Sequence, residues 1–151
     1  MSHFQEFLPR PDGKAILLSI KPKYAALILA GSKSVEFRRT WAAQDVKVIV
    51  LYASSPVQKI VGVVAVDEVV TASPSSLWHI CSERGGGLTR NELRSYFSGK
   101  TKGIAVLLGN AFKFTNELEP LDVISNFTPP QSFRYLETDE YIKIEKRIVG
   151  K

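Results

Sequence analysis

The sequence predicts an α+β fold, a small mixed β-barrel with short helices packed around it. β-branched runs dominate the chain, the segments between them are uneven in length, and one early helix interrupts them. Uneven connections argue against a repeated strand-helix-strand unit, whereas a barrel leaves few sheet edges exposed. With 151 residues and 44% hydrophobic content, the chain can bury one sizeable core. We therefore predict an irregular arm over residues 1–14, which holds two prolines and a glycine, and a single domain over residues 15–151.

The first half of the predicted domain contains most of the strands. Residues 15–20, AILLSI, read as a short strand, after which Pro22 suits the first turn of a helix that Gly31 ends. Residues 34–39, SVEFRR, alternate apolar and charged side chains with the period of a half-buried strand. Two β-branched runs follow, VKVIVLYA and KIVGVVAVDEVV, with a turn-like break between them.

The second half begins with two predicted helices. Ser73 and Pro74 offer an N-cap and a first-turn proline, and Thr89 with Glu92 forms a capping box for a helix that ends near Gly99. The glycine run between these helices lacks the pattern of a phosphate loop and reads as a flexible connection. GIAVLLG and AFKF then predict a strand pair. The C-terminal KIEKRIVGK fits either a last strand or a mobile tail.

Composition narrows the class of protein without fixing it. Twenty Lys and Arg against 15 Asp and Glu give a net charge of +5, which suits a phosphate-bearing partner but also many other soluble proteins. The single Cys81 cannot form an intramolecular disulfide, and two histidines are too few for a Cys/His metal site, so we expect no metal and no cofactor. The longest apolar runs fall short of a membrane span and no leader is evident, so we expect a cytoplasmic protein without a membrane partner.

A cluster of oppositely charged residues is the most informative part of the sequence. Lys33, Glu36 and Arg38 lie within six residues, and Lys21 lies at the other end of the predicted helix. A strand-helix-strand unit would bring both lysines to one rim. One interpretation is a solvated salt-bridge cluster on an exposed strand face, worth at most about 1 kcal/mol per pair. The other is a basic cleft in which the cations meet phosphate or a base edge while Glu36 orients them. Spacing does not choose between them.

These residues carry a family resemblance. SIKPKYAALILAGSKSVEFRR, followed by KVIVLYASSPVQKIVGVVAV and GIAVLLG, resembles the ASCH domain family, a branch of the PUA-like β-barrels. The resemblance covers residues 15–136, and its most specific part is G-x-K followed by E-F-R-R. Within the family, the chain is most similar to the branch described as predicted regulators, which also carries a late segment like PPQSFRYL.

The resemblance implies a cleft between the early helix and the sheet, where PUA-like relatives hold RNA or a modified nucleobase. It implies that this chain binds RNA or a modified nucleoside, in a regulatory role. The family's cleft positions fall on a set of polar, charged and aromatic residues, the last two more weakly: Lys21, Lys33, Glu36, Arg38, Tyr52, Ser54, Ser132 and Phe133. From the residues alone, an aromatic side chain at the end of a strand, such as Tyr52, either stacks on a base or fills the barrel mouth.

The resemblance also leaves open whether the protein is an enzyme. One ASCH branch hydrolyses acetylated cytidine with a lysine, a threonine and a glutamate. Its lysine matches Lys33, but the threonine position is Glu36 here, and the glutamate has no clear match, Glu83 being the nearest carboxylate. Other ASCH proteins are ribonucleases. In an enzyme of this fold, Lys33 and Glu36 would be the catalytic candidates.

Two further hypotheses concern partners. A protein-interaction module would take an acidic peptide in the same charged cleft, and it would ignore nucleic acid. The basic C-terminal end could also extend an electrostatic track for RNA that leaves the cleft, through these residues: Lys143, Lys146, Arg147 and Lys151. The sequence does not indicate an oligomeric state.

Overall fold

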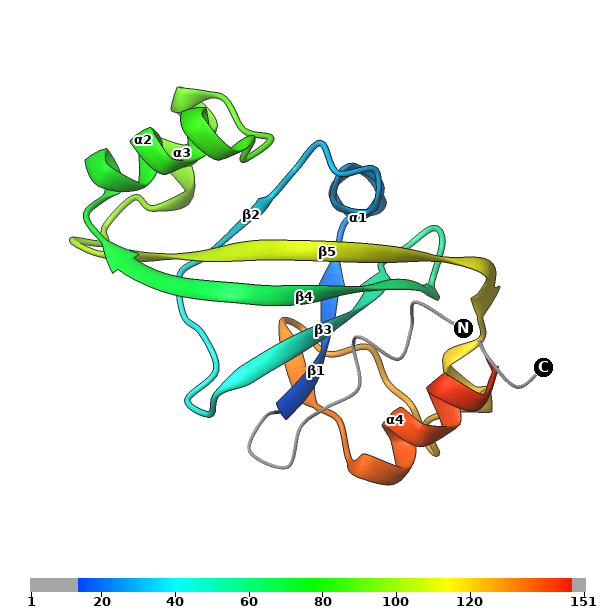
Figure 1. Cartoon of the computed structure of the whole chain (residues 1–151). Coiled ribbons are helices and arrows are strands. Elements are labelled where there is room, and N and C mark those ends of the chain that lie inside the picture. Colours follow the sequence, from blue (N-terminus) through cyan, green and yellow to red (C-terminus); the bar gives the residue numbers. More distant parts are fainter. Residues whose placement is uncertain (1–13, 148–151) are drawn as a thin grey trace.

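The structure, a computed structural model, describes residues 14–147 (Figure 1). In chain order its elements are β1 (Lys14–Ile20), α1 (Pro22–Leu29), β2 (Val35–Arg38), β3 (Val46–Ala53), β4 (Lys59–Ala72), α2 (Pro74–Arg84), α3 (Arg90–Tyr96), β5 (Gly103–Leu118), the 3₁₀ helix η2 (Pro120–Asp122), β6 (Phe133–Tyr135) and α4 (Thr138–Glu145). The arm predicted for residues 1–14 lies outside the described residues except for Lys14, which opens β1. The single domain over residues 15–151 stays a prediction. No helix within the described part is long and apolar enough to cross a membrane.

The strands form one mixed sheet in the order β2-β5-β4-β3-β1-β6. The pair β1 and β3 is parallel, and the other neighbouring pairs are antiparallel. The sheet curls into a half-barrel, so that β1 and β3 run across the direction of β4 and β5 (Figure 1). The predicted α+β fold, a small mixed barrel with helices around it, is therefore confirmed, and β2 and β6 are its two edges.

Two segments differ from the sequence prediction. GIAVLLG and AFKF do not form a strand pair but belong to one long strand, β5, whose register against β4 shifts at three points and so accommodates the curl. The C-terminal segment KIEKRIVGK is neither a strand nor a tail over residues 143–145 but the end of helix α4, and its residues 148–151 lie outside the described part. Tyr141 and Ile144 drive this choice, because a helix buries both side chains against the sheet.

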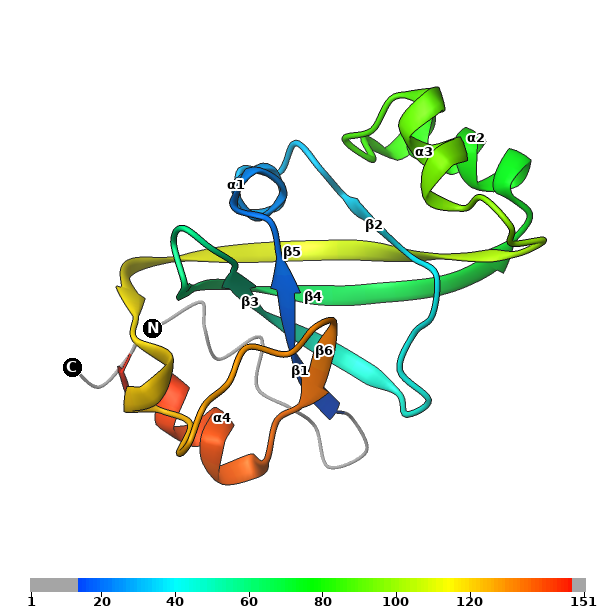
Figure 2. The same ribbon diagram turned by 180° about the vertical axis from the view of Figure 1, so that it is seen from behind.

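The alternation of side chains along β1 and β3 separates two cores. Leu17 and Val50 face the core that contains Ile144 of α4, whereas Ile16 and Ile49 face the core that contains α1. A third cluster lies between the sheet and the pair α2 and α3. Figures 1 and 2 show α4 at the opposite end of the molecule from α2 and α3. Along β5, Val106 faces the core that contains α1, whereas Ala105 faces α2 and α3.

The helix ends follow the predicted signals. Pro22 starts α1, and Gly31 follows it with φ +84°. The Ser73 side chain accepts a hydrogen bond from the backbone of α2, and Gly85 ends that helix with φ +68°. Thr89 and its partner three residues later form the predicted capping box of α3.

The close approach of α1 to β4 generates the first prediction. A Cβ at Gly62 would lie 2.5 Å from Leu29 Cδ2 and 2.8 Å from the Phe112 carbonyl oxygen. The carbonyl belongs to the neighbouring strand and cannot move freely, so Gly62→Ala should lower the free energy of unfolding by roughly 1–3 kcal/mol. Chemical denaturation measures this. The exposed strand variant Thr115→Ala is the control and should stay within about 0.5 kcal/mol of the native protein. Equal stability of the native protein, Gly62→Ala and Thr115→Ala would refute this packing of α1.

Candidate functional site

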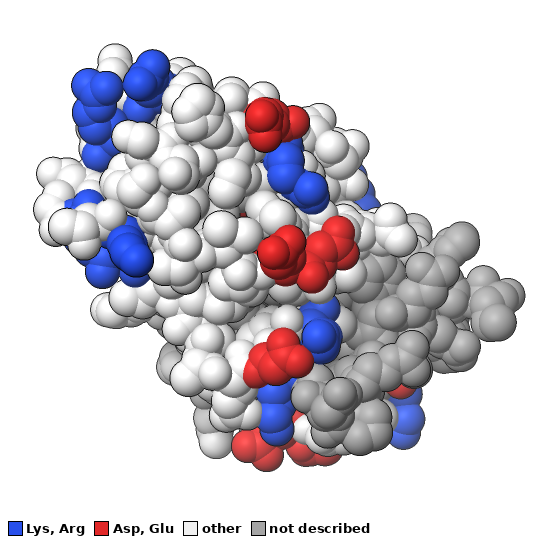
Figure 3. All heavy atoms as spheres, turned by 60° about the vertical axis from the view of Figure 1, so that its left-hand side comes forward, with Lys and Arg blue, Asp and Glu red and all other residues white. Residues whose placement is uncertain are grey.

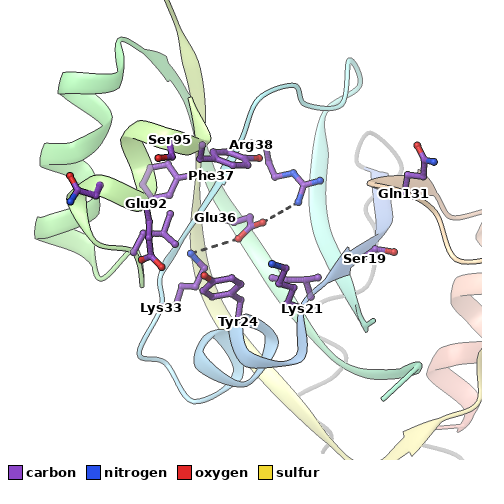
Figure 4. Close-up of a pocket in the computed structure, with 14 residues that line it drawn as sticks. Ser19, Lys21, Tyr24, Lys33, Glu36, Phe37, Arg38, Glu92, Ser95 and Gln131 are labelled. Atoms are coloured by element: carbon purple, nitrogen blue, oxygen red, sulfur yellow. Dashed lines mark hydrogen bonds and ion pairs between the residues drawn. The ribbon is translucent and has the colours of Figure 1, made fainter. Parts of the chain in front are cut away.

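A cleft of about 780 Å³ opens between α1, β2 and α3 (Figure 4). It contains four of the predicted site residues, which are Lys21, Lys33, Glu36 and Arg38. The rest of its lining comes from Ser19, Ile20, Tyr24, Phe37, Leu88, Asn91, Glu92, Ser95, Tyr96 and Gln131. Strand, helix and strand, from β1 to β2, therefore bring both lysines to one cleft, as the sequence analysis anticipates.

A row of alternating charges forms one side of this cleft. Glu36 lies at its centre, with one carboxylate oxygen 3.7 Å from Lys33 Nζ and the other accepting a hydrogen bond of 3.1 Å from Arg38 Nη1. Lys33 also donates to the carbonyl oxygen of Gly86. Lys33 and Glu36 are only 3% and 7% exposed. The row is therefore a buried network and not the solvated surface cluster that was the alternative interpretation.

The strand β2 explains this burial only in part. Val35 and Phe37 pack against α2 and α3, as their alternation predicts, and Glu36 points to the other face. Of the two interpretations of this other face, burial of Glu36 excludes the solvated one. The sheet curls, so that face turns toward α1 and the far edge of the sheet.

Arg38 joins the two edges of the half-barrel. Its Nη1 atom is bound to Glu36 on β2, while its Nη2 atom donates to the hydroxyl of Ser132, which directly precedes β6. Trp41 packs edge-on against Phe133 with the ring centroids 5.7 Å apart. Ser132 and Phe133 thus support the rim of the cleft through Arg38 and Trp41, and neither is among the residues that line it.

Aromatic rings flank the buried lysine. The Nζ atom of Lys33 lies 5.5 Å from the ring centroid of Tyr24 and 5.7 Å from that of Phe37. Tyr96, on the α3 side of the cleft, is 36% exposed. Rings on both α1 and α3 therefore offer faces on which a planar, unsaturated ligand can stack.

Burial shapes the acid-base chemistry of the cleft. Desolvation lowers the pKa of Lys33 below its ordinary value of 10.5, while the carboxylate of Glu36 opposes this shift and holds the pKa up. Burial also raises the pKa of the Tyr96 phenol. Lys33 consequently releases its proton more readily than a surface lysine does.

The predicted residues Tyr52 and Ser54 lie in a second, smaller cleft of about 360 Å³. Tyr52 packs against Phe127 with the ring centroids 5.2 Å apart, and burial raises its pKa. The two clefts share four lining residues, Ser19, Ile20, Lys21 and Gln131. The structure therefore places Tyr52 and Ser54 beside the main cleft and not within it, with Lys21 at the junction.

The sequence does not predict several of the residues that form the cleft. The glycine run is more than a connection, because the carbonyl of Gly86 binds Lys33, and a side chain at Gly86 would overlap Cys81 and Phe37. Glu92, and not Glu83, is the α3-side carboxylate that lines the cleft. The capping box signals the position of Glu92 within α3. Nothing local indicates that α3 faces α1, since that depends on the curl of the sheet.

The basic C-terminal end does not continue the cleft. Lys143, Lys146 and Arg147 lie on or just after α4, which packs on the opposite face of β1 and β3 from α1. Arg147 pairs with Asp122 at 3.0 Å. None of these three residues lines either cleft, so the described part of the chain gives the electrostatic track no support, and Lys151 lies outside the described residues. Within residues 14–147, no three His, Cys, Asp or Glu side chains are grouped to hold a metal ion.

Comparisons with known proteins agree with this architecture. Residues 18–113 match the family model of the ASCH domain. The chain is 31% identical over 137 residues to an ASCH domain-containing ribonuclease of Zymomonas mobilis, which covers 89% of this chain and 92% of that protein. It is also 30% identical over 127 residues to a large ribosomal subunit protein of Ureaplasma parvum, a match that covers 82% of this chain but only 40% of that longer protein.

The fold is also similar to that of a solved structure. The crystal structure of ASCH from Zymomonas mobilis superposes with a TM-score of 0.82 at 29% identity, covering 88% of this chain and 94% of that one. That protein has also been crystallised with one tyrosine replaced by phenylalanine and with one serine replaced by alanine. The likeness therefore extends over most of both chains.

The buried charge row predicts a stability effect. Replacing Glu36 with Gln leaves Lys33 and Arg38 without a charged partner inside the protein, so the free energy of unfolding should fall by roughly 1–3 kcal/mol. This exceeds the half kcal/mol or so of a surface strand position. Chemical denaturation provides the value, with Glu68→Gln on an exposed position of β4 as the matched control. Equal values for the two variants would place Glu36 in solvent.

The same variant predicts a change in proton affinity. The ¹³Cε resonance of Lys33 should titrate below pH 10.5 in the native protein, and at a still lower pH in Glu36→Gln, because the carboxylate that raises the pKa is gone. Since the folded state holds this proton less tightly than the unfolded chain, stability due to Lys33 should be lost as pH falls through the folded-state pKa. A Lys33 pKa that rises in Glu36→Gln would contradict the assigned cause.

Proposed function

The chain belongs to the ASCH domain family, and from this we propose that it binds single-stranded RNA or a modified nucleoside in the cleft between α1, β2 and α3. The observation that supports the proposal most is the buried row of Lys33, Glu36 and Arg38 along an aromatic-lined cleft. Stacking surfaces next to fixed hydrogen-bonding groups are what a single-stranded base requires.

Each part of the cleft has a role in this proposal. A base stacks on Tyr24 or Tyr96, and the hydrogen-bonding groups of Glu36 and Arg38 meet its edge. Lys21, which is exposed where the two clefts meet, contacts the phosphate. The neighbouring nucleotide then occupies the smaller cleft, where Tyr52 is only 2% exposed and packs against Phe127, so its ring fills the wall and does not stack on a base.

A ribonuclease is the second candidate, favoured by the related Zymomonas protein of that name. Cleavage would join the 2′ oxygen to phosphorus as the bond to the 5′ oxygen breaks, leaving a 2′,3′-cyclic phosphate and a 5′-hydroxyl. Such a reaction needs a group that takes the 2′-hydroxyl proton and another that protonates the leaving oxygen. Glu36 and Lys33, 3.7 Å apart, are a carboxylate and an ammonium of this kind.

The remaining alternatives have less support. For deacetylation of acetylated cytidine, this chain lacks the threonine hydroxyl of the hydrolytic branch. Glu36 occupies that position, three residues after Lys33. An acidic peptide would meet two carboxylates, Glu36 and Glu92, in the same cleft. A cytoplasmic location and a regulatory role stay predictions.

Binding at the junction of the clefts can be tested with a labelled oligouridylate of 12 nucleotides. Lys21→Ala should weaken binding and reduce the slope of log K against log salt by about 0.7, the value for one lost single-strand phosphate contact. Fluorescence anisotropy over a salt series measures both. Lys47→Ala removes the same charge at the opposite end of the parallel strands and should change neither quantity. Native values in both variants would refute the phosphate contact.

An assay for RNA cleavage distinguishes a binding protein from a ribonuclease. As a binding protein, the native chain at saturating concentration should leave the oligouridylate intact, with no 2′,3′-cyclic phosphate ends by mass spectrometry. Appearance of those ends, together with their loss in Lys33→Met and in an oligomer of 2′-deoxynucleotides, would replace the binding proposal with the ribonuclease. The Lys33→Met sample, purified identically, controls for contaminating nuclease.

A further inference from the structure

We infer that single-stranded RNA held in the cleft leaves it over the C-terminal end of α3, along a basic track made of Arg39, Lys100 and Lys102. The inference rests on the proposed function and adds to it the path of the chain outside the cleft. The three residues come from two segments that are far apart in sequence and that lie next to the paired ends of β2 and β5.

Backbone geometry brings the track together. Arg39 Nη1 donates to the carbonyl oxygens of Tyr96 and Ser98, at 2.7 and 3.1 Å, which fixes Arg39 at the end of α3. Arg38 is paired with Ile104 across the β2 and β5 ladder, so the register carries the residues after Arg38 alongside those before Ile104, where Lys102 lies.

The turn that bears the lysines is packed firmly against α3. The backbone N–H of Lys100 donates to the carbonyl of Phe97 at 2.9 Å. The ring of Phe97 lies so close to Gly103 that a Cβ there would overlap it. The lysine stems therefore start from a fixed backbone and not from a free loop.

The track is continuous with the cleft. Tyr96, whose carbonyl binds Arg39, also lines the cleft and is the most exposed of its aromatic residues. A base that emerges past Tyr96 can stack on its ring while the following phosphates meet Arg39 and the lysines. Among residues 14–147, the two carbonyl partners of Arg39 both bind through Nη1, which leaves its other donors for the phosphates.

Charge favours this exit over the other end of the molecule. Residues 93–107 contain three basic residues and no Asp or Glu, and no track residue has an acidic partner within 4 Å among the described residues. Figure 3, which brings this end of the molecule forward, shows two groups of Lys and Arg with no acidic side chain between them. Residues 137–147, by contrast, hold four acidic and three basic residues, so this end has no excess of positive charge to attract phosphate.

Two oligouridylates, of 3 and 12 nucleotides, test the track. The shorter one can fill the cleft, and the longer one reaches beyond it. In the double variant Lys100→Ala with Lys102→Ala, the 12-mer should bind more weakly, with a salt slope smaller by about 1.4, which is two lost single-strand contacts. Binding of the 3-mer should not change. The control is Lys143→Ala with Lys146→Ala, which removes two lysines from the α4 end and should match the native protein for both oligomers.

The outcomes distinguish the track from the cleft. If the native protein binds both oligomers and the Lys100 and Lys102 variant keeps the native salt slope, the track is refuted and the proposed function stands. Equal losses for the 3-mer and the 12-mer would also refute it, because the lysines would then act on the cleft itself. If the native protein binds neither oligomer, the proposed function fails and the track fails with it.

Discussion

The site depends on the two ion pairs that the Glu36 carboxylate makes with Lys33 and Arg38. Burying a lysine and an arginine is costly unless an opposite charge accompanies them, and Glu36 is placed between both. Each cation then reaches a different part of the chain, since Lys33 binds the carbonyl of Gly86 and Arg38 binds Ser132. One acidic side chain thereby couples the start of β2 to the connection between α2 and α3 and to the far edge of the sheet.

This coupling explains why a cleft exists at all. The edges β2 and β6 approach each other without pairing, and side chains bridge them where a closed barrel would have a backbone ladder. The gap left by incomplete closure is lined by groups that a ladder would exclude: a buried ion network and aromatic rings. The same incompleteness leaves the smaller cleft beside the first, with Lys21 common to both.

Local patterns in the sequence predict the helices and strands well, but they predict the tertiary contacts between these elements poorly. Alternation in SVEFRR correctly buries Val35 and Phe37, and the capping signals correctly start α2 and α3. The burial of Glu36, the long continuous β5 and the role of Gly86 depend on how far the sheet curls, which no window of a dozen residues records. The family resemblance supplied Lys21 and Lys33 as cleft residues. The separate position of Tyr52 follows from its face of β3 and needed the structure.

The long ladder of β4 and β5 has a mechanical consequence. It carries α2 and α3 as an insertion between its two strands, where they pack against β2 and β5, whereas α1 belongs to a different core. The cleft is accordingly a seam between these two cores, which are joined by the β4 and β5 ladder and by the segment that leads from α1 into β2. Widening it requires bending that ribbon, whose pairing already shifts between Val64 and Glu68, and parting a few polar contacts such as that of Lys33 with Gly86. The core beneath α4 lies on the other face of β1 and β3, so we expect a wider ligand to leave that part of the interior unchanged.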